Sequence, residues 1–391
     1  MLTGMANAHE MIAKAEDILW PARRSIAEVG ILFPQSATYW DLLGVVAGGR
    51  IIEDFTNHYL DDRTTDYLAE VWGLWRAMAL FKNIPVDFVD EAGLLEPNTL
   101  KPFKVLFITE PDLPTAGAAA LGRWVRAGGT LITVSNAGTS DQYHEPSSVL
   151  AKLSGMASKR DAPAKGGLYQ GERFYWPSGF VPPLVKNGTL DQSLCPNATL
   201  CKFGARGAAG DFIAVEDVGP LLSPQTPLSP PGGVLGTFSN GKPAIKQTVS
   251  GKGAYIHFAW LPGISFSCGG GTYQPSQSNA IASLLQNMLQ LAGVRPLVSV
   301  SVDNVEAPIL TGPRGDVVIA LNHASLGNIT WDANGTMHGN LPLELNVTLG
   351  YKPSSVTSMQ LGTVPYTMLM PGEVSTKLPV FHFADVIVFK R

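Results

Sequence analysis

The sequence predicts an α/β protein in two parts, a doubly wound parallel sheet followed by a small antiparallel β-sandwich. In the first part, short apolar runs alternate with segments of helical periodicity, the pattern of parallel strands joined by crossover helices. From about residue 296 onward, short alternating strands recur between turn residues, and helical periodicity is lost. Hydrophobic residues make up 45% of the chain and charged residues 15%, so both parts can bury a core.

We expect three segments along the 391 residues. Residues 1–25 form a connector helix, because apolar residues such as Ile12 and Leu19 recur on one stripe of it. Residues 26–295 form the α/β domain, in which strands and helices alternate. Residues 296–391 form the β-sandwich, since only strand-like patterns follow that point.

The α/β domain begins with four apolar runs, each typical of a strand buried on both faces of a parallel sheet. They are EVGILF at 28–33, VDFV at 86–89, KVLFIT at 104–109 and TLITVS at 130–135. Helices at 65–82 and 115–127 alternate with them, and the second places Ala118, Leu121 and Val125 on one face. Strands spaced by helices imply right-handed crossovers, with helices on both faces of the sheet.

Residues 156–235 interrupt this pattern with glycine, proline and serine, so we expect a loop-rich insertion there. Regular structure resumes with a strand pair at 243–249 and 254–259 and a helix at 276–292. The strands predicted for the β-sandwich are separated by turn residues. They run over 298–302, 317–321, 343–349, 356–361 and 385–389.

Charge and composition exclude two classes of partner. The net charge is −4 and the pI is about 6.0, and no basic stripe is present, so nucleic-acid binding has no support. No run of about twenty apolar residues occurs, so no membrane association is expected. The start of the chain does not read as a signal peptide. We therefore predict a soluble protein whose compartment the sequence leaves open.

Two features keep a secretory origin open. Cys195 and Cys201 bracket the segment CPNATLC, whose spacing suits a local disulfide and a pair of free thiols equally, whereas Cys268 stands alone. Asn-x-Thr sequons occur at Asn187, Asn197, Asn328, Asn334 and Asn346. No Cys/His cluster has metal-ligand spacing, so no metal is expected. The glycine run at 269–271 lacks the lysine of a phosphate loop, and no cofactor is expected.

Four stretches carry a resemblance to a known family. They are AEVGILFPQSATYWDL at 27–42, KVLFITEPDLPTAGAAALGRWVRAGGTLITVSNAG at 104–138, GKGAYIHFAWLPGISF at 251–266 and VEAPILTGPRGDVVIALNHAS at 305–325. They resemble the β-galactosidase trimerisation domain and the C-terminal β-domain of family 42 glycoside hydrolases. The resemblance implies a flavodoxin-like sheet, similar to that of class I glutamine amidotransferases, for residues 26–295. The insertion at 156–235 matches least.

In that family the chemistry belongs to an N-terminal (β/α)8 barrel with two catalytic glutamates, and the residues before 26 leave no room for one. The opening segment ANAHEMIAKAEDILW resembles the tail of such a barrel. The resemblance therefore implies a non-catalytic oligomerisation or accessory module, trimeric, which works with a barrel supplied elsewhere. Two alternatives stay open: a fragment of a full-length hydrolase acting on β-galactosides, and a stand-alone carbohydrate-binding module.

An amidotransferase places a cysteine or serine nucleophile on a tight elbow between a strand and a helix. The corresponding stretch here is VSNAG at 134–138, which holds Ser135 and no cysteine. His144 and Glu145 follow nearby in the sequence, but we favour a turn role for Ser135. Glutaminase activity is therefore not expected.

A ligand on an open parallel sheet would lie beyond the carboxyl ends of the strands. Polar and aromatic residues placed there are Gln35, Tyr39, Trp40, Asp90, Glu91, Glu110, Asp112, Asn136, Asp141 and Trp260. Rings stack on sugar faces and carboxylates accept hydroxyl protons, so these residues are candidates for a saccharide site. An interface with a partner, or ordinary loop polarity with a tryptophan in the core, also accounts for them, and we favour these two interpretations over a saccharide site.

Glu110 and Asp112 form the sharpest of these candidates. Two carboxylates this close in sequence could raise one another's pKa and create a general acid. Because Pro111 separates them and Pro114 follows, we favour a role at the start of the next helix. Asp112 would then complement the helix dipole, and Thr115 would cap the helix.

Overall fold

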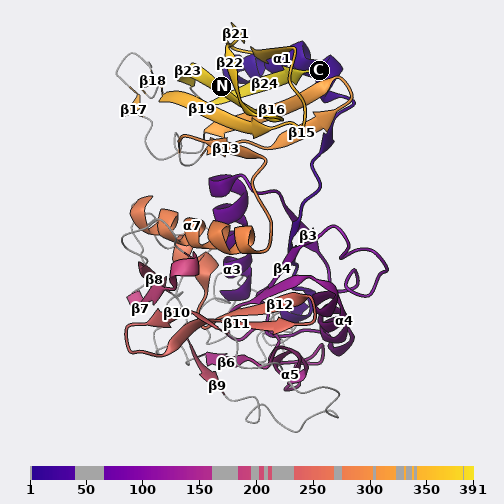
Figure 1. Ribbon diagram of the computed structural model, residues 1–391, viewed down its shortest axis with the longest axis vertical. Coiled ribbons are helices and arrows are strands. Elements are labelled where there is room, and N and C mark those ends of the chain that lie inside the picture. The colour runs from indigo at the N-terminus through magenta and orange to yellow at the C-terminus, as the bar shows by residue number, and fades with distance from the viewer. Residues whose placement is uncertain are drawn as a thin grey trace. The chain divides into compact units, whose positions relative to one another are not determined.

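The computed structural model divides the chain into two compact units. The residues it describes are 2–39, 66–160, 184–194, 202–206, 210–213, 233–267, 275–302, 305–322, 330–331, 337–338, 341–381 and 383–391. The β unit comprises Met1–Ala27, Met78–Pro85 and Arg295–Arg391. The α/β unit comprises Glu28–Ala77 and Val86–Val294 (Figure 1). Each unit has its own core and is described by itself.

The α/β unit is built on a nine-stranded mixed sheet. In spatial order its strands are β3 (Val86–Val89), β2 (Val29–Leu32), β4 (Val105–Ile108), β5 (Thr130–Thr133), β12 (Gly253–Phe258), β11 (Pro243–Ser250), β10 (Val234–Phe238), β7 (Leu184–Leu190) and β8 (Lys202–Arg206). The first five strands are parallel and the remaining four add antiparallel. Numbered along the chain, the parallel strands lie in the order 2-1-3-4-5.

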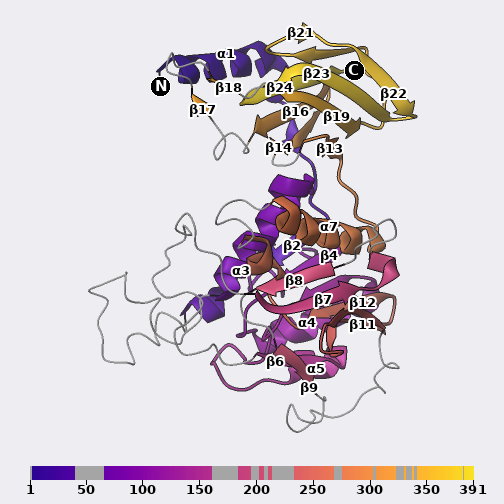
Figure 2. The same ribbon diagram turned by 90° about the vertical axis from the view of Figure 1, so that its left-hand side faces the viewer.

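The parallel half of the sheet is covered on both faces, as its continuous apolar runs predict. All four residues of β2 and all four of β4 are buried, which requires packing above and below the strands. Several described helices, besides the helical residues 35–39, belong to this unit or its border, and α7 and α5 among them lie on opposite sides of the sheet in Figure 2. They are α3 (Asp66–Trp75), continued by the π-helical turn η1 (Arg76–Leu80), α4 (Thr115–Ala127), α5 (Val149–Ser154), α6 (Pro262–Ser267) and α7 (Pro275–Leu291).

Helix α4 confirms the face that its periodicity predicts. Ala118, Leu121 and Val125 are buried, and they share one hydrophobic cluster with Leu106 of β4 and Leu131 of β5. The start of the helix differs from the prediction: Pro114 takes the cap position, and the side chain of that residue offers no hydrogen bond. Thr115 is the first helical residue, because the fixed backbone of proline already orients the chain for the turn.

Two glycines allow α3 and α6 to cross at close range. A Cβ added to Gly73 would lie 2.0 Å from the carbonyl oxygen of Gly263, and a Cβ added to Gly263 would lie 2.3 Å from the carbonyl oxygen of Glu70. The Glu70 side chain uses this proximity, since it accepts hydrogen bonds of 2.8 Å from the backbone N–H groups of Gly263 and Ile264. A buried carboxylate thus satisfies donors at the start of α6.

The segment predicted as a loop-rich insertion also contributes strands. Within 156–235 lie β6 (Ala157–Arg160), β7, β8, β9 (Gly210–Ile213) and the start of β10. β6 pairs with β9 in a separate two-stranded sheet, and the others extend the main sheet. Composition concealed these strands because they are polar and rich in glycine; in β7, Asn187 and Thr189 are exposed. Such a strand shows no apolar run.

The β unit packs two antiparallel sheets around one core. The larger sheet contains β1 (Arg23–Arg24), β14 (Val305–Glu306), β15 (Ile309–Gly312), β16 (Gly315–Asn322), β24 (Ala384–Lys390), β20 (Ser355–Ser358) and β21 (Gly362–Thr363). The smaller contains β13 (Val298–Val300), β19 (Leu341–Thr348), β23 (Glu373–Phe381) and β22 (Tyr366–Met370), and β17 (Thr330–Trp331) pairs with β18 (Met337–His338). Val318 and Ile387 of the larger sheet meet Leu345 and Val374 of the smaller in one cluster.

The helix at the start of the chain belongs to this β unit. α1 (Leu2–Leu19) packs Ala15 and Ile18 against Val317 of β16 and Val386 of β24. These valines alternate with the residues that face the sandwich core, because successive side chains of a strand point to opposite faces. Figure 2 shows α1 lying along the larger sheet. The segment predicted as a connector is thus also a cover for one face of this sheet.

Candidate functional site

Three acidic residues lie just past the carboxyl ends of β3 and β4, the two parallel strands that pair with β2 on either side. Glu91 follows β3, and Glu110 and Asp112 follow β4. Parallel strands end at one edge of their sheet, so the fold brings these carboxyl groups together as the strand positions predict. All three are buried, Glu110 completely. We call Glu91, Glu110 and Asp112 the carboxyl cluster.

Glu91 is held by hydrogen bonds from the segment that follows β2. Its Oε1 accepts a bond of 2.6 Å from the Ser36 backbone N–H, and its Oε2 accepts one of 2.5 Å from the Ser36 hydroxyl. Residues 35–39 are helical, so Glu91 meets the first turn of a helix, where backbone donors lack partners. Both of its oxygens are therefore committed to structure.

Glu110 has the opposite environment. Both carboxyl oxygens are buried and neither has a hydrogen-bond partner among the described residues. Burial raises the pKa of Glu110 well above its ordinary value, and the nearby charges of Glu91 and Asp112 raise the pKa further. Each of these causes disfavours the ionised form of Glu110.

Asp112 bonds to a residue that sequence spacing did not pair with it. Its Oδ1 lies 2.8 Å from Nδ1 of His144, whose side chain is 61% exposed while that of Asp112 is 2% exposed. Burial raises the pKa of Asp112, and the hydrogen bond and charge of His144 partly oppose that rise. Asp141 shapes this turn, since its Oδ1 accepts bonds from the backbone N–H groups of Tyr143 and Glu145.

Of the aromatic candidates, Trp260 belongs to the core of the α/β unit. Trp260 is fully buried, and its ring stacks on Phe203 with centroids 4.3 Å apart and an interplanar angle of 4°. Because the ring is enclosed, Trp260 is a core residue with no face open to a sugar, which is the interpretation that loop polarity with a buried tryptophan gives. Tyr39 is 59% exposed at the end of its helical turn. Trp40 lies outside the described residues.

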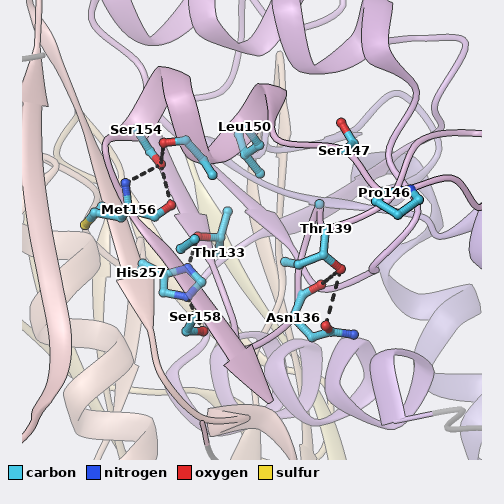
Figure 3. A pocket seen from close by; sticks show the side chains of 14 residues that line it. Thr133, Asn136, Thr139, Pro146, Ser147, Leu150, Ser154, Met156, Ser158 and His257 are labelled. Atoms are coloured by element: carbon cyan, nitrogen blue, oxygen red, sulfur yellow. Dashed lines mark hydrogen bonds between the residues drawn. The ribbon is translucent and has the colours of Figure 1, made fainter. Parts of the chain in front are cut away.

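A pocket of about 450 Å³ opens beside the ends of β5 and β12. We call it the α5 pocket. Its wall is formed by Thr133 of β5, the loop 136–139, Leu150 and Ala151 of α5, β6, and His257 of β12. Asn136, one of the predicted strand-end residues, lies on one side of it with Thr139, and Thr133, His257 and Ser158 lie on the other (Figure 3).

A chain of hydrogen bonds crosses one wall of the α5 pocket. Nδ1 of His257 lies 2.5 Å from the Thr133 hydroxyl oxygen, and Nε2 lies 2.7 Å from the Ser158 hydroxyl oxygen. Burial, and secondarily the charge of Lys246, lowers the pKa of His257 to about 3. The imidazole is therefore neutral at physiological pH, with both ring nitrogens bonded.

This wall was not predicted from the sequence. Ser158 falls in the segment read as an insertion, and it is 99 residues away from His257 along the chain. One signal could have found half of the pair: in GAYIHF, His257 replaces an apolar residue inside a strand buried on both faces. A buried histidine needs partners for its two nitrogens, but nothing in the sequence identifies them.

The remaining predicted sites are the sequons and the cysteines. Asn187 is exposed on β7, whereas Asn346 is half-buried in β19 with its Oδ1 buried and without a bond among the described residues. Outside the described residues are Cys195, Cys201, Cys268, Asn197, Asn328 and Asn334. In the part of the chain that the structure describes, no group of three His, Cys, Asp or Glu residues is arranged to hold a metal. No described helix has the length and apolar character to span a membrane.

Neither a known protein family nor a curated protein matches the sequence. Solved structures match the fold. A catalytic mutant of a GH42 β-galactosidase from G. stearothermophilus matches with a TM-score of 0.57 at 14% identity, over 94% of this chain and 41% of that one. The β-galactosidase from Bacillus circulans sp. alkalophilus gives 0.57 at 15% identity, over 98% and 44%. α-L-Fucosidase isoenzyme 2 from Paenibacillus thiaminolyticus gives 0.53 at 13%, over 97% and 51%.

At identities this low, the likeness is one of fold. The chain shares the fold of part of these glycoside hydrolases, and it spans less than half the length of the two β-galactosidases. Nearly all of this chain takes part in the match, so the likeness includes residues of both the α/β unit and the β unit.

Proposed function

We propose that this chain is a non-catalytic accessory module of a β-galactosidase-like glycoside hydrolase, which self-associates and positions a catalytic (β/α)8 barrel. The observation that carries the proposal is the fold match, which takes in almost the whole chain and less than half of each β-galactosidase. The parallel strand order 2-1-3-4-5 supports a flavodoxin-like, amidotransferase-like sheet for the α/β unit. Self-association as a trimer is the resemblance-based part of the proposal.

The state of the carboxyl cluster supports the absence of catalysis. Glycoside hydrolysis uses a pair of carboxyl groups that reach the sugar, one as an acid and one as a nucleophile or base. Here Glu110 is fully enclosed and its pKa is raised by burial, Glu91 is bonded through both oxygens to Ser36, and Asp112 is bonded to His144. Each of the three carboxyl groups is therefore enclosed or already bonded within the protein.

The turn at 134–138, which corresponds to the nucleophile elbow of an amidotransferase, is also unsuited to catalysis. Ser135 is 2% exposed, and its hydroxyl has no hydrogen-bond partner among the described residues. A serine nucleophile needs a base within hydrogen-bond reach to remove its proton. The enclosed position of Ser135 therefore supports the expectation that the chain has no glutaminase activity.

A second candidate is that the chain is one portion of a complete hydrolase that acts on β-galactosides. The coverage of about two fifths of each β-galactosidase favours this reading, because such a portion would leave space for a barrel in the same polypeptide. The third candidate is a stand-alone sugar-binding module that uses the strand-end aromatics Trp40 or Trp260. The enclosed ring of Trp260 gives it no support, and Trp40 lies outside the described residues.

One experiment on the purified chain tests the main proposal. Hydrolysis of a panel of chromogenic β-galactosides is measured, and the oligomeric mass of the same sample is determined by gel filtration with light scattering. We expect a defined oligomer and no turnover. A strict monomer at high concentration contradicts self-association, and turnover contradicts the non-catalytic role. If turnover occurs, its loss in Glu110→Gln or Asp112→Asn, with Glu145→Gln as the control, would assign it to the carboxyl cluster.

A further inference from the structure

The α5 pocket offers an uncharged surface of the size that small ligands use. Its volume of about 450 Å³ falls within the range common to ligand sites. Among the described residues, the fourteen that line it include no aspartate, glutamate, lysine or arginine, and its one titratable side chain is the neutral His257. An ion entering this pocket would lose its hydration without gaining a countercharge, so the lining selects an uncharged ligand.

Polar groups face the pocket from two sides, and they retain unused bonding capacity. On one side, the His257 tautomer that carries its proton on Nδ1 satisfies the whole series of hydrogen bonds. Ser158 donates to Nε2 of His257, Nδ1–H donates to Thr133, and Thr133 donates to the Ile256 carbonyl. The two hydroxyl oxygens then keep free lone pairs. On the other side, Oδ1 of Asn136 accepts from Thr139, while its Nδ2 has no partner among the described residues.

Aliphatic residues also line the pocket, namely Leu150, Ala151, Pro146 and Met156, and Leu150 lies between the two polar sides in Figure 3. Ser147 and Ser154 line it as well, and the Ser154 hydroxyl bonds to the carbonyl oxygens of Ala151 and Met156. A ligand that fills the space must therefore place hydroxyl or similar groups at two opposite walls and C–H groups between them. Small cyclic polyols and monosaccharides have this distribution, with neutral donors and acceptors around an apolar ring.

The same geometry argues against a nucleophilic role for Ser158. A catalytic serine transfers its proton to the histidine, which must then be stabilised as the imidazolium ion. His257 has the hydroxyl of Thr133 in place of an orienting carboxylate, and Lys246 lies beside it on the neighbouring strand. Both features disfavour the imidazolium ion. This wall of the pocket is therefore suited to binding a ligand and not to activating Ser158 as a nucleophile.

We propose that the α5 pocket binds a small, uncharged polyhydroxylated molecule of monosaccharide size, with Asn136 donating from one wall and the Ser158–His257–Thr133 chain accepting from the other. The pocket lies entirely within the α/β unit. The assignment is therefore independent of self-association and of any barrel, and it survives if the proposed function fails.

Binding of defined probes to the purified chain tests the assignment. The neutral probes are galactose, glucose and myo-inositol, and the charged counterparts are galacturonate and glucosamine; each is titrated by calorimetry and by ligand-observed NMR. We expect saturable binding of at least one neutral probe, with its charged counterpart at least about tenfold weaker because of its desolvation. The oligomeric mass is measured separately, so a monomer that still binds separates the two proposals.

Three variants locate the site, and one serves as a matched control. Ala151→Phe fills the pocket and should abolish binding. Asn136→Gly removes the amide at a position whose φ of 72° glycine adopts readily, and Ser158→Ala removes one hydroxyl; each should weaken binding about three- to tenfold. Thr248→Val alters a strand threonine as buried as Thr133, at 7% exposure, but outside the pocket, and should leave binding unchanged.

Thermal unfolding shows whether each variant is folded, and Asn136→Gly keeps the test decisive if Ala151→Phe disrupts packing. Binding of a neutral probe that Asn136→Gly weakens and Thr248→Val leaves intact establishes the site. The assignment is overturned if no neutral probe binds the folded chain, or if binding is unchanged in Asn136→Gly and Ser158→Ala.

Discussion

The carboxyl cluster and the α5 pocket both place titratable groups in the interior of one sheet unit, yet they treat them in opposite ways. His257 has a partner on each ring nitrogen, whereas Glu110 has no partner for either oxygen among the described residues. Burial is the largest cause of the pKa shift in both cases, and in both it disfavours the charged form. What differs is whether the neutral form is satisfied.

The difference shows that burial alone does not define a functional site. Neutral His257 completes a wall whose hydroxyls line the α5 pocket, while Glu110 is completely buried and lines no part of that pocket. The two groups also give opposite pH responses. An acid whose folded-state pKa is raised destabilises the fold as pH rises, and a base whose folded-state pKa is lowered destabilises it as pH falls.

The largest expected effect on stability comes from removing His257, the buried group whose ring nitrogens both have partners. His257→Leu leaves the hydroxyls of Thr133 and Ser158 without their ring partner in a buried wall. We expect the free energy of unfolding at pH 7.5 to fall by about 2–4 kcal/mol, from two buried groups losing hydrogen bonds. Urea denaturation measures the change, with Thr248→Val as the buried control. A loss under about 1 kcal/mol would mean that the chain of bonds contributes little.

The acid side of the pH profile sharpens the comparison. The pKa of His257 lies at about 3 in the fold, below its ordinary value of 6.5, so the stability linked to neutral His257 is complete above about pH 6.5 and is lost as pH falls toward 3. This group alone should lower the free energy of unfolding by about 1.4 kcal/mol per pH unit in that window. Denaturation of the native chain and of His257→Gln at pH 7.5, 6 and 5 isolates the effect. Parallel profiles would refute it.

Glu110 should govern the opposite, alkaline side of the dependence of stability on pH. Its folded-state pKa is raised by burial and by the charges of Glu91 and Asp112, so the fold loses stability as pH rises above the ordinary value of 4.5. Glu110→Gln mimics the neutral acid and should become more stable than the native chain, by up to about 1.4 kcal/mol per pH unit while Glu110 stays protonated. Urea denaturation at pH 5 and 8 measures this gap, and the exposed Glu145→Gln should show none. A gap that shrinks with pH contradicts the assignment.

The smallest effect on stability is expected for the hydrogen bond between buried Asp112 and exposed His144. His144→Ala removes the hydrogen bond to Asp112, but the histidine side chain is 61% exposed and its charge is screened by water. We expect a loss of about 1 kcal/mol or less near pH 6, together with a further rise in the pKa of Asp112. NMR titration of the Asp112 carboxyl follows that pKa. No rise would show that His144 does not influence the carboxyl group.

The elements that could be predicted from the sequence are those whose burial produces a recognisable pattern of apolar residues. The strand at 86–89 and the helix at 115–127 were placed with their observed bounds, because a strand packed on both faces is an apolar run and a helix packed on one face is a stripe. Strand β23, Glu373–Phe381, was missed, although alternate residues in it are buried. Pro379 interrupts its pattern, and proline within a run argues against a strand.

The candidate site could be predicted only as far as the strand ends could. Placing β3, β4 and β5 was enough to put Glu91, Glu110 and Asn136 at the edge of the sheet. Sequence position could not show that Glu110 is enclosed or that Trp260 stacks on Phe203, because those states depend on distant segments. The α5 pocket could not be predicted for the same reason, because its polar wall brings together residues from three separate strands.

The packing of α1 on β24 has a consequence for the order in which the chain can fold. Ala15 and Ile18 meet their partners Val386 and Val388 only after synthesis has passed residue 388. The α/β unit lies between them in sequence and has its own core, so it can fold first on the ribosome. The β unit relies on contacts of very long sequence separation, which are slow to form. Until they form, the apolar stripe of α1 stays exposed to chaperones and proteases.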